Sequence, residues 1–534
     1  MFCAFSAGLV LGIPGLPTKA HATQAPIVES NIPSAPAPAA GSDIPDIPTV
    51  LSRLDASRYA AIFALQEEGN WKAADAQIEQ LKDKTLLGEV LAQRYLTARY
   101  PTTFDEARSW LEQYADLPEA RAIWTLAKKR APGKAVPSPV PATAQVATPI
   151  EPSEAAGEQR GEQTPLPPEP AAYGLETPGR FEAGLTAWRA KKWSEAAADF
   201  ESVARDRNTP SWYVAASAFW AARTHLMLKE PQKVDAWFAV AAEQPRTFYG
   251  MLARRTLGLS QDARFDRQPL SKAEIAQLEA LPGGHRALAL VQVGETDRAE
   301  AELRALTTRG NKSLASAIVA LADLANMPAL CLALDRQTRS APRQIDAQYP
   351  MPPWKPRNGF SVDRALLFAL MMQESRFEAD AKGGGGAAGL MQLMPATAKA
   401  VARRSGIPLR NVAELVDPVL NLSLGQEYVK QLIEHEQING NLILVLAAYN
   451  SGTAPLTKWQ SQPEYQNDPL LFIEALPRET TRLYVQRVLT NMWIYRQRLG
   501  QDAPDLDALA GNQWPTYVSM DSSTQGPKQH AASR

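Results

Sequence analysis

The chain has 534 residues, which is too long for one hydrophobic core and predicts several folded units. Apolar residues make up 45% and charged residues 21%, ordinary globular usage that excludes a wholly disordered chain and a multi-span membrane protein. Lys and Arg (56) nearly balance Asp and Glu (57), so no net field favours a nucleic-acid partner. Two Cys and five His exclude a disulfide framework and leave little for a metal site.

The N-terminus has the layout of a secretory signal peptide. An apolar run, Phe2 to Leu16, is too short to span a bilayer and leads to Ala20-His21-Ala22, an A-x-A cleavage pattern. No Lys or Arg precedes the run, so the alternative is an apolar terminus without a targeting role. Residues 1–22 are expected to be removed on export, and no other run is apolar enough to anchor the chain in a membrane.

Two proline-rich stretches divide the chain. Their Pro, Ala, Ser, Thr and Glu content cannot bury enough apolar surface to offset chain ordering, which is typical of extended linkers. The predicted order is a signal peptide (1–22), a linker (23–48), an N-terminal helical unit (49–131), a second linker (132–172), a longer helical unit (173–340), a chemical domain (341–500) and a polar tail (501–534).

The two helical units share a weak recurring motif. A polar turn followed by small residues begins a helix at 69–74, again at 192–197 and again at 294–299. Small residues let helices pack closely, so the pattern predicts stacked helix pairs that form a superhelix, although the irregular spacing defines no single repeat family. Such a superhelix also offers a surface for protein partners.

The chemical domain begins with an apolar helix, expected over 362–375 with Ser361 as its N-cap. Glu374 lies at the C-terminal end of this helix, where apolar surroundings and the negative end of the helix dipole both raise a carboxyl pKa. An acid with a raised pKa is what general-acid cleavage of a glycosidic bond requires near neutral pH. The alternative for Glu374 alone is a solvated surface charge.

The segments that follow strengthen the chemical interpretation. Four successive glycines, Gly383 to Gly386, open the segment GGGGAAGLMQLMP and let the backbone approach a ligand closely. Nucleotide binding is disfavoured because the phosphate-loop pattern G-x-x-x-x-G-K-[ST] is missing. An apolar helix ends at AAYNSG (447–452), and LPRETTRLYV (476–485) opens a last amphipathic helix.

The order E-S, G-L-M-Q-L-M-P-x-T-A, A-Y-N-x-G and T-R-x-Y-V resembles the catalytic domain of soluble lytic murein transglycosylases, which is similar in fold to goose-type lysozyme. Residues 247–255, TFYGMLARR, resemble a segment of that family's helical superhelix. The resemblance implies a mainly α protein, a superhelix of helix pairs followed by a lysozyme-like domain. It also implies a periplasmic enzyme whose partners are the glycan strands of peptidoglycan, with no cofactor and no metal.

The resemblance also implies residue roles. Glu374 matches the single catalytic acid, which protonates the glycosidic oxygen between N-acetylmuramic acid and N-acetylglucosamine. The resulting carboxylate then takes the proton of the C6 hydroxyl, which closes onto C1 and leaves a 1,6-anhydro end. The implied substrate-binding residues are Gln392, Met394, Tyr449, Asn450 and Tyr484.

The chain departs from the family pattern at several positions. Gly383 stands where Ser is common, Thr480 stands where Glu is common, and Ser451-Gly452-Thr453 replaces A-G-P. The first two changes remove polar contacts to the saccharide or its surroundings, and the proton-transfer residue stays in place. Two alternatives remain open: a muramidase that uses a second carboxylate and water, and a non-catalytic glycan-binding scaffold.

Overall fold

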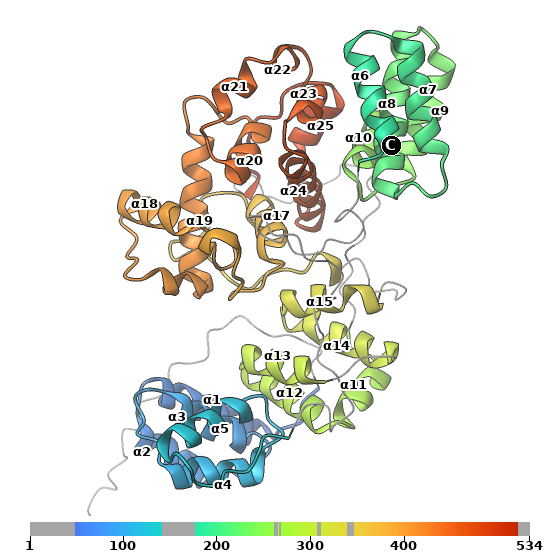
Figure 1. Ribbon diagram of the computed structural model, residues 1–534. Helices are drawn as coiled ribbons and strands as arrows, with labels where there is room; N and C mark the ends of the chain where they lie inside the picture. The colour runs from blue at the N-terminus through green and yellow to red at the C-terminus, as the bar shows by residue number, and fades with distance from the viewer. Residues whose placement is uncertain are drawn as a thin grey trace, which may run out of the picture. The chain divides into compact units, whose positions relative to one another are not determined.

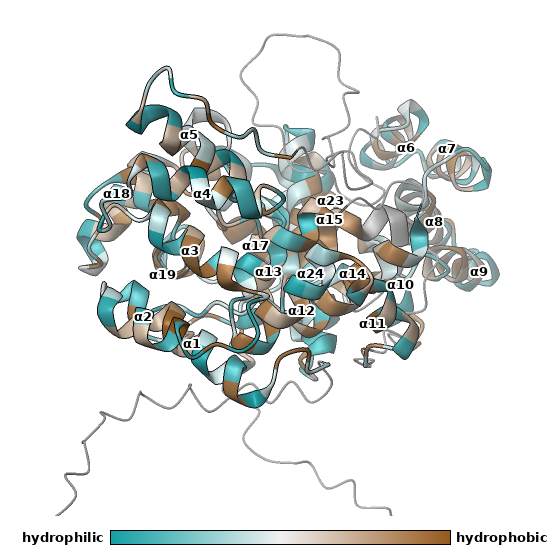
Figure 2. Cartoon of the chain, turned by 90° about the horizontal axis from the view of Figure 1, so that it is seen from below, coloured by the Kyte–Doolittle hydropathy of each residue, from teal (hydrophilic) through white to brown (hydrophobic). Residues whose placement is uncertain are grey.

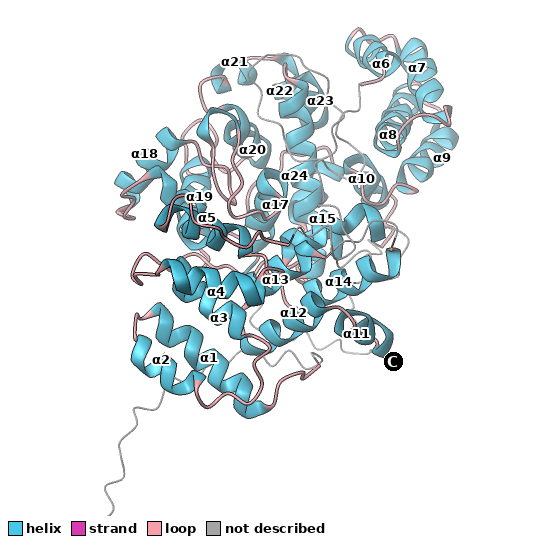
Figure 3. Ribbon diagram, turned by 60° about the horizontal axis from the view of Figure 1, so that its bottom comes forward, coloured by secondary structure: helices cyan, strands magenta, loops and turns pink. Residues whose placement is uncertain are grey.

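The computed structural model describes residues 48–140, 177–260, 265, 269–306, 311–338 and 347–521, without the side chains of 335–338 and 467. Over these ranges the regular structure is helical, and the only strand-like pairs are three isolated bridges (Figure 3). The predicted mainly α class is confirmed. All of these residues belong to one unit, 44–534. The predicted signal peptide, the first linker up to residue 47 and residues 141–172 of the second linker lie outside the described residues.

The helices before residue 340 form consecutive hairpins, as the recurring motif predicts (Figure 1). The first group is α1 (Arg53–Glu67), α2 (Trp71–Ile78), α3 (Leu87–Leu96), α4 (Phe104–Tyr114) and α5 (Ala120–Arg130). The second is α6 (Gly179–Arg189), α7 (Trp193–Arg205), α8 (Ser211–Met227), α9 (Pro231–Ala242) and α10 (Phe248–Thr256). The third is α11 (Lys272–Glu279), α12 (Pro282–Val293), α13 (Thr296–Ala305), α14 (Lys312–Leu324) and α15 (Pro328–Thr338).

The recurring motif of the helical units combines a residue with left-handed backbone, which ends one helix, and a small residue, which lets the next helix pack closely. Gly69 and Gly294 have φ of 79° and 88°, a conformation that glycine adopts without steric cost, and each ends the first helix of its pair. Ala74 and Ala299, early in the second helices, are fully buried against the first. Brown apolar and teal polar stretches alternate along many of these helices, which bury one face (Figure 2). Helix α8 is the exception, because residues 215–222 are buried without a break.

The N-terminal helices share a core with a segment far along the chain. Tyr59, Ile62 and Phe63 of α1 belong to the same buried cluster as Leu288 of α12 and Ile318 of α14. The Gln292 side chain accepts hydrogen bonds from the amides of residues 50 and 51 at 3.1 and 2.9 Å and donates one to the carbonyl of residue 51 at 2.9 Å. The first part of the predicted N-terminal unit, to residue 90, therefore packs on α11–α15, whereas α4 and α5 pack around Trp110 in a separate cluster.

The second group of helices shares its core with the chemical domain. Phe248 of α10 stacks on Trp493, with ring centroids 5.4 Å apart and an interplanar angle of 17°. The buried Tyr249 hydroxyl donates to Glu474 at 2.6 Å, and Gln486 donates to the same oxygen at 2.8 Å. The predicted unit 173–340 is thus divided between two cores.

The chemical domain is a cluster of helices around one long central helix, α24 (Glu479–Arg498), on which α17 and α20 both pack (Figure 1). The others are α17 (Arg364–Ser375), α18 (Pro395–Ser405), α19 (Pro418–Ile433), α20 (Leu442–Ser451), α21 (Leu456–Gln460), α22 (Pro463–Asn467), α23 (Pro469–Ala475) and α25 (Pro504–Ala510), with 3-10 turns η2 (Gly384–Gly386) and η3 (Val412–Val416). None of the helices in the described part combines the length and apolar character that a bilayer-spanning segment needs.

The packed chain continues past the predicted boundary at residue 500. After α25, Trp514 packs on Tyr465, and the amide of Tyr517 donates to the carbonyl of Gly440 at 2.8 Å. Residues 519–521 then hold the start of α17, because the amide of residue 520 donates to the buried carboxylate of Asp363 at 2.7 Å. Residues 501–521 are therefore part of the domain, and only 522–534 lie outside the described residues.

Candidate functional site

Glu374 is the second-last residue of α17, an almost wholly buried helix. The helix begins two residues later than predicted: Asp363, not Ser361, occupies the N-cap, and its carboxylate bonds to residues 519–521 instead of capping the helix. The helix ends because Arg376 and Phe377 are left-handed, with φ of 51° and 66°. The chain changes direction at this turn, so Glu374 lies at the end of the helix, as predicted.

The Glu374 carboxyl group is half-buried and makes one short hydrogen bond. The hydroxyl of Tyr484, on α24, donates to its Oε1 at 2.6 Å. Burial raises the pKa of Glu374 to about 7, and the Tyr484 hydrogen bond acts in the opposite direction. The group therefore titrates near neutral pH, where one carboxyl is able to give a proton and later take one.

Three tyrosines surround this carboxyl. The rings of Tyr449 and Tyr484 are nearly parallel, at 11° with centroids 6.5 Å apart, and Tyr428 of α19 lies 5.3 Å from Tyr449. Burial, and next the Glu374 charge, raise the pKa of all three phenols, so they remain neutral hydrogen-bond donors. The structure thus joins Glu374 to two predicted residues, Tyr449 and Tyr484.

Sequence reasoning missed Tyr428. One signal was available: Tyr428 follows Asn421 by seven residues, so the two lie on one face of α19. Asn421 holds the loop beside Glu374, since its Oδ1 accepts from the amide of Met391 at 2.8 Å and its Nδ2 donates to the carbonyl of Ala388 at 2.9 Å. Asp417-Pro418, a sequence pair typical of a helix start, begins α19, with Asp417 as the N-cap.

The glycine-rich segment forms a tight loop against η3 and α19. Gly389 has φ of 77°, and a Cβ there would lie 2.1 Å from the carbonyl oxygen of Leu415, so only glycine fits. The Ser375 hydroxyl donates to the carbonyl of Leu390 at 2.8 Å, and the Tyr449 hydroxyl donates to that of Met391 at 2.8 Å. The loop is therefore fixed directly to the residue after Glu374 and to the tyrosine cluster.

Gln392 and Met394 differ in how they lie on this loop. The Gln392 side-chain nitrogen donates to the carbonyls of Ala381 and Gly389 at 3.0 and 2.9 Å, so it holds the loop's own backbone. Met394 is 44% exposed, and its terminal methyl carbon would lie 2.9 Å from a Cβ at Gly385. The Met394 side chain therefore offers an apolar surface to solvent, whereas part of Gln392 is occupied internally.

Asn450 is exposed and is held by α24. Its side-chain oxygen accepts from the buried Thr481 hydroxyl at 2.9 Å and from Ser451 at 3.3 Å, and the two hydroxyl oxygens lie 2.7 Å apart. Ser451, a departure from the family pattern, thus contributes to this link between α20 and α24.

Position 480, where the family commonly has Glu, is open to solvent in this chain. Thr480 is exposed, and the Glu479 carboxylate accepts a hydrogen bond from Thr177 and lies 3.7 Å from the guanidinium of Arg482. Glu479 therefore does not replace the family carboxylate.

Three other carboxylates of the chemical domain have partners of their own. Glu378 pairs with Arg304 at 2.8 Å, Asp417 accepts from the amide of Leu420 at 2.6 Å, and Glu414 accepts from the amide of Arg410 at 3.2 Å. Within the described residues, no group of three or more His, Cys, Asp or Glu side chains is arranged to hold a metal ion.

The chemical domain is similar in sequence to known proteins. Residues 353–472 match the family model described as Transglycosylase SLT domain. The soluble lytic murein transglycosylase of Salmonella typhimurium is 33% identical over 144 residues, and that of Escherichia coli K12 is 32% identical over 158 residues. These segments cover 27% and 29% of this chain but 22% and 24% of the two relatives, so the match spans about a quarter of their length.

A solved structure extends the likeness beyond this domain. The complex of the 70-kDa soluble lytic transglycosylase with bulgecin A superposes with a TM-score of 0.50 at 20% identity, over 87% of this chain and 65% of that one. At this identity the likeness concerns the fold alone, and it agrees with the predicted helical superhelix followed by a lysozyme-like domain.

Proposed function

We propose that the protein is a lytic transglycosylase of peptidoglycan, because residues 353–472 match the Transglycosylase SLT domain model. One observation carries the proposal: a half-buried glutamate with a pKa of about 7 and a 2.6 Å bond from Tyr484. Glu374 is the only residue that the proposal assigns to proton transfer. The exposed Met394 and Asn450 are assigned to the glycan, and Tyr449 and Tyr484 to holding the acid and the sugar.

The proposed reaction uses Glu374 twice. The protonated acid gives its proton to the oxygen between N-acetylmuramic acid and N-acetylglucosamine as the C1–O bond breaks, and the substrate's N-acetyl group stabilises the cation at C1. The carboxylate then removes the proton of the C6 hydroxyl, whose oxygen bonds to C1. The product is a 1,6-anhydro sugar, no water is consumed, and Glu374 is protonated again. A pKa near 7 suits both steps.

The partners of the other carboxylates support one residue in both roles. A retaining or inverting hydrolase uses two carboxyl groups on either side of the bond. Glu378 is engaged by Arg304, and Asp417 starts a helix. The pKa of Glu374 responds to burial and to Tyr484, with no contribution from a neighbouring carboxylate among the described residues.

The test is Glu374→Gln, with Glu378→Gln as its matched control. Glu378 undergoes the same chemical change four residues away, has a side chain that is 40% exposed, and leaves Arg304 paired with Glu300 at 2.6 Å. We expect Glu374→Gln to release glycan fragments from purified sacculi at least about 100-fold more slowly than wild type, since general acid–base catalysis contributes roughly 10²–10⁴. Both variants should still sediment with sacculi. Undiminished release by Glu374→Gln would refute the assignment.

The same proposal includes export to the periplasm, where such a substrate lies. Its support is the layout of residues 1–22 together with the chemistry of the domain. Cell fractionation of the full chain tests it: we expect the protein in the periplasmic fraction with a mature N-terminus at Thr23, and full-length protein in the cytoplasm would contradict it.

A further inference from the structure

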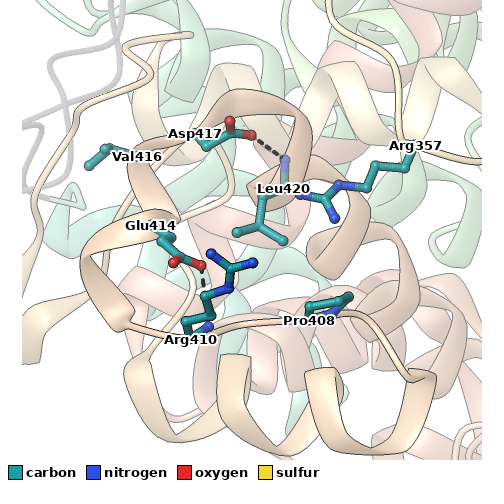
Figure 4. Close-up of a pocket in the computed structure, with 7 residues that line it drawn as sticks. All are labelled: Arg357, Pro408, Arg410, Glu414, Val416, Asp417 and Leu420. Atoms are coloured by element: carbon teal, nitrogen blue, oxygen red, sulfur yellow. Dashed lines mark hydrogen bonds between the residues drawn. The ribbon is translucent and has the colours of Figure 1, made fainter. Parts of the chain in front are cut away.

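A pocket of about 470 Å³ opens on the chemical domain between the chain before α17 and the start of α19 (Figure 4). Its floor is the buried side chain of Leu420. Figure 4 shows the guanidinium groups of Arg357 and Arg410 approaching Leu420 from two sides of the pocket. Glu414 and Asp417 complete the charged lining. The roles proposed above use none of these residues.

The two arginines have fixed backbones and available side chains. The amide of Arg357 donates to the Ser423 hydroxyl at 2.9 Å, and the amide of Arg410 donates to Glu414 at 3.2 Å. Neither guanidinium has an ion-pair partner among the described residues, and both residues are exposed. Each is therefore free to form a paired hydrogen bond with a carboxylate, the geometry that guanidinium favours.

The two carboxylates give the pocket the opposite charge as well. Glu414 uses Oε2 to accept from the amide of Arg410, and Asp417 uses Oδ1 to accept from the amide of Leu420. Each bond involves one oxygen, so the second oxygen of each group is available to a ligand. Two positive and two negative groups thus line one cavity with no net charge.

This balance selects among ligand classes. A phosphate or a lone carboxylate is attracted by the two arginines and repelled by Glu414 and Asp417, and a neutral sugar gains no charge-assisted bond, whereas a zwitterion matches both signs of charge. The exposed side chain of Val416, together with Pro408, adds an apolar wall suited to a short hydrocarbon group. We propose that this pocket binds a short zwitterionic peptide, with its carboxylates on the two arginines and its ammonium group on Glu414 and Asp417.

The pocket and the Glu374 site share one structural residue. Asn421 donates at 2.8 Å to the carbonyl of Leu415, which lies between the pocket residues Glu414 and Val416 in the chain. It also holds Ala388 and Met391 in the loop beside Glu374. If the proposed function holds, a peptide of this kind is attached to the substrate itself, because peptidoglycan strands carry short peptides with several carboxylates and a free amine. The alternative source is a free peptide of the same chemistry.

Binding is tested with the full chain and the tripeptide L-Ala-γ-D-Glu-meso-diaminopimelate as the probe, by titration calorimetry. We expect saturable binding to wild type and binding weaker by about tenfold or more in Arg357→Met and Arg410→Met, since each loses a charge-assisted pair while keeping most of the side-chain hydrocarbon. Arg403→Met, an exposed arginine of α18 outside the pocket, is the matched control and should bind as wild type does. Fully N-acetylated tripeptide should also bind about tenfold more weakly. No saturable binding, or equal affinity in all three variants, would overturn the proposal.

A kinetic comparison identifies the source. Wild type and Arg410→Met are assayed on intact strands and on strands stripped of peptide by an amidase. A loss of kcat/KM in Arg410→Met that is confined to peptide-bearing strands assigns the pocket to the attached peptide. Equal kcat/KM for the two proteins on both substrates, together with tripeptide binding, assigns it to free peptide. If wild type cleaves neither substrate, the proposed function fails, while calorimetry still decides whether the pocket binds the peptide.

Discussion

Replacing Tyr484 with phenylalanine removes one hydroxyl from the environment of Glu374 and leaves the aromatic ring in place. The ring is 1% exposed and lies parallel to that of Tyr449, so its packing survives the change. The hydroxyl donates at 2.6 Å to Glu374 and lowers the pKa of this carboxyl, against the larger effect of burial. Its loss should therefore raise the pKa of Glu374 above about 7.

The size of the change follows from the bond. A hydrogen bond to a charged group contributes about 1.5–3 kcal/mol. The lower end of this range applies to Glu374, because the protonated acid also accepts a bond from Tyr484 and only the difference between the two forms changes the pKa. One pH unit corresponds to about 1.4 kcal/mol, so the pKa should rise by about 1 pH unit.

The assay is the pH dependence of kcat/KM on soluble glycan strands, which reports the ionisation of the free enzyme. The acid must be protonated at the start of the reaction, so activity falls as pH rises through the pKa of Glu374. We expect this alkaline decline to move upward by about 1 pH unit in Tyr484→Phe. In Tyr449→Phe the decline should stay in place, because that hydroxyl donates to the Met391 carbonyl. An unchanged decline in Tyr484→Phe would refute the reasoning.

Two further predictions concern stability. Asp363→Asn should lower the free energy of unfolding by about 2 kcal/mol, because the buried Asp363 carboxylate accepts hydrogen bonds from residues 519–521 and bonds to charged groups contribute about 1.5–3 kcal/mol. Arg496, 3.5 Å from Asp363, keeps its second buried partner, Asp505. Urea unfolding followed by tryptophan fluorescence measures the change, and a value below about 1 kcal/mol would contradict the prediction. Glu89 is fully buried, and its pKa is raised to about 9, chiefly by burial and next by the charges of Glu119 and Glu302. Because the folded pKa is higher than the unfolded pKa of about 4.3, the contribution of Glu89 to stability is complete below that unfolded value and is lost as the pH rises through about 9. The stability of Glu89→Gln relative to wild type should therefore increase from pH 6 to pH 9 in thermal unfolding scans, and a pH-independent difference would show that Glu89 stays ionised.

The sequence was most informative where function and local structure depend on neighbouring residues. The position of Glu374 at the end of an apolar helix follows from spacing alone. Its raised pKa was also predicted, and the structure attributes it to burial, to which other helices contribute. Tyr484, which donates a hydrogen bond to Glu374, lies 110 positions further along the chain. Only the family resemblance indicated that Tyr484 belongs to the site. Tyr428 lay outside the recognised motifs and was missed.

Long-range packing was the part that local patterns could not supply. Asp363 was expected inside the first turn and Ser361 at the N-cap, but bonds from residues 519–521 fix Asp363 at the start of the helix. Because of the same hydrogen bonds, residues 501–521, which were predicted as part of a polar tail, are folded onto the domain. Trp514 and Tyr517 were the apolar signals there, and their partners, Tyr465 and Gly440, lie on distant parts of the chain.

The central claim is that one carboxyl group, on Glu374, serves as acid and then as base without water. Mass spectrometry of fragments released from purified sacculi in ¹⁸O-labelled water tests it most directly. The account predicts N-acetylmuramic acid ends that are lighter than reducing ends by one water and carry no label. Reducing ends that contain ¹⁸O would contradict it and identify a hydrolase in which a second group activates water.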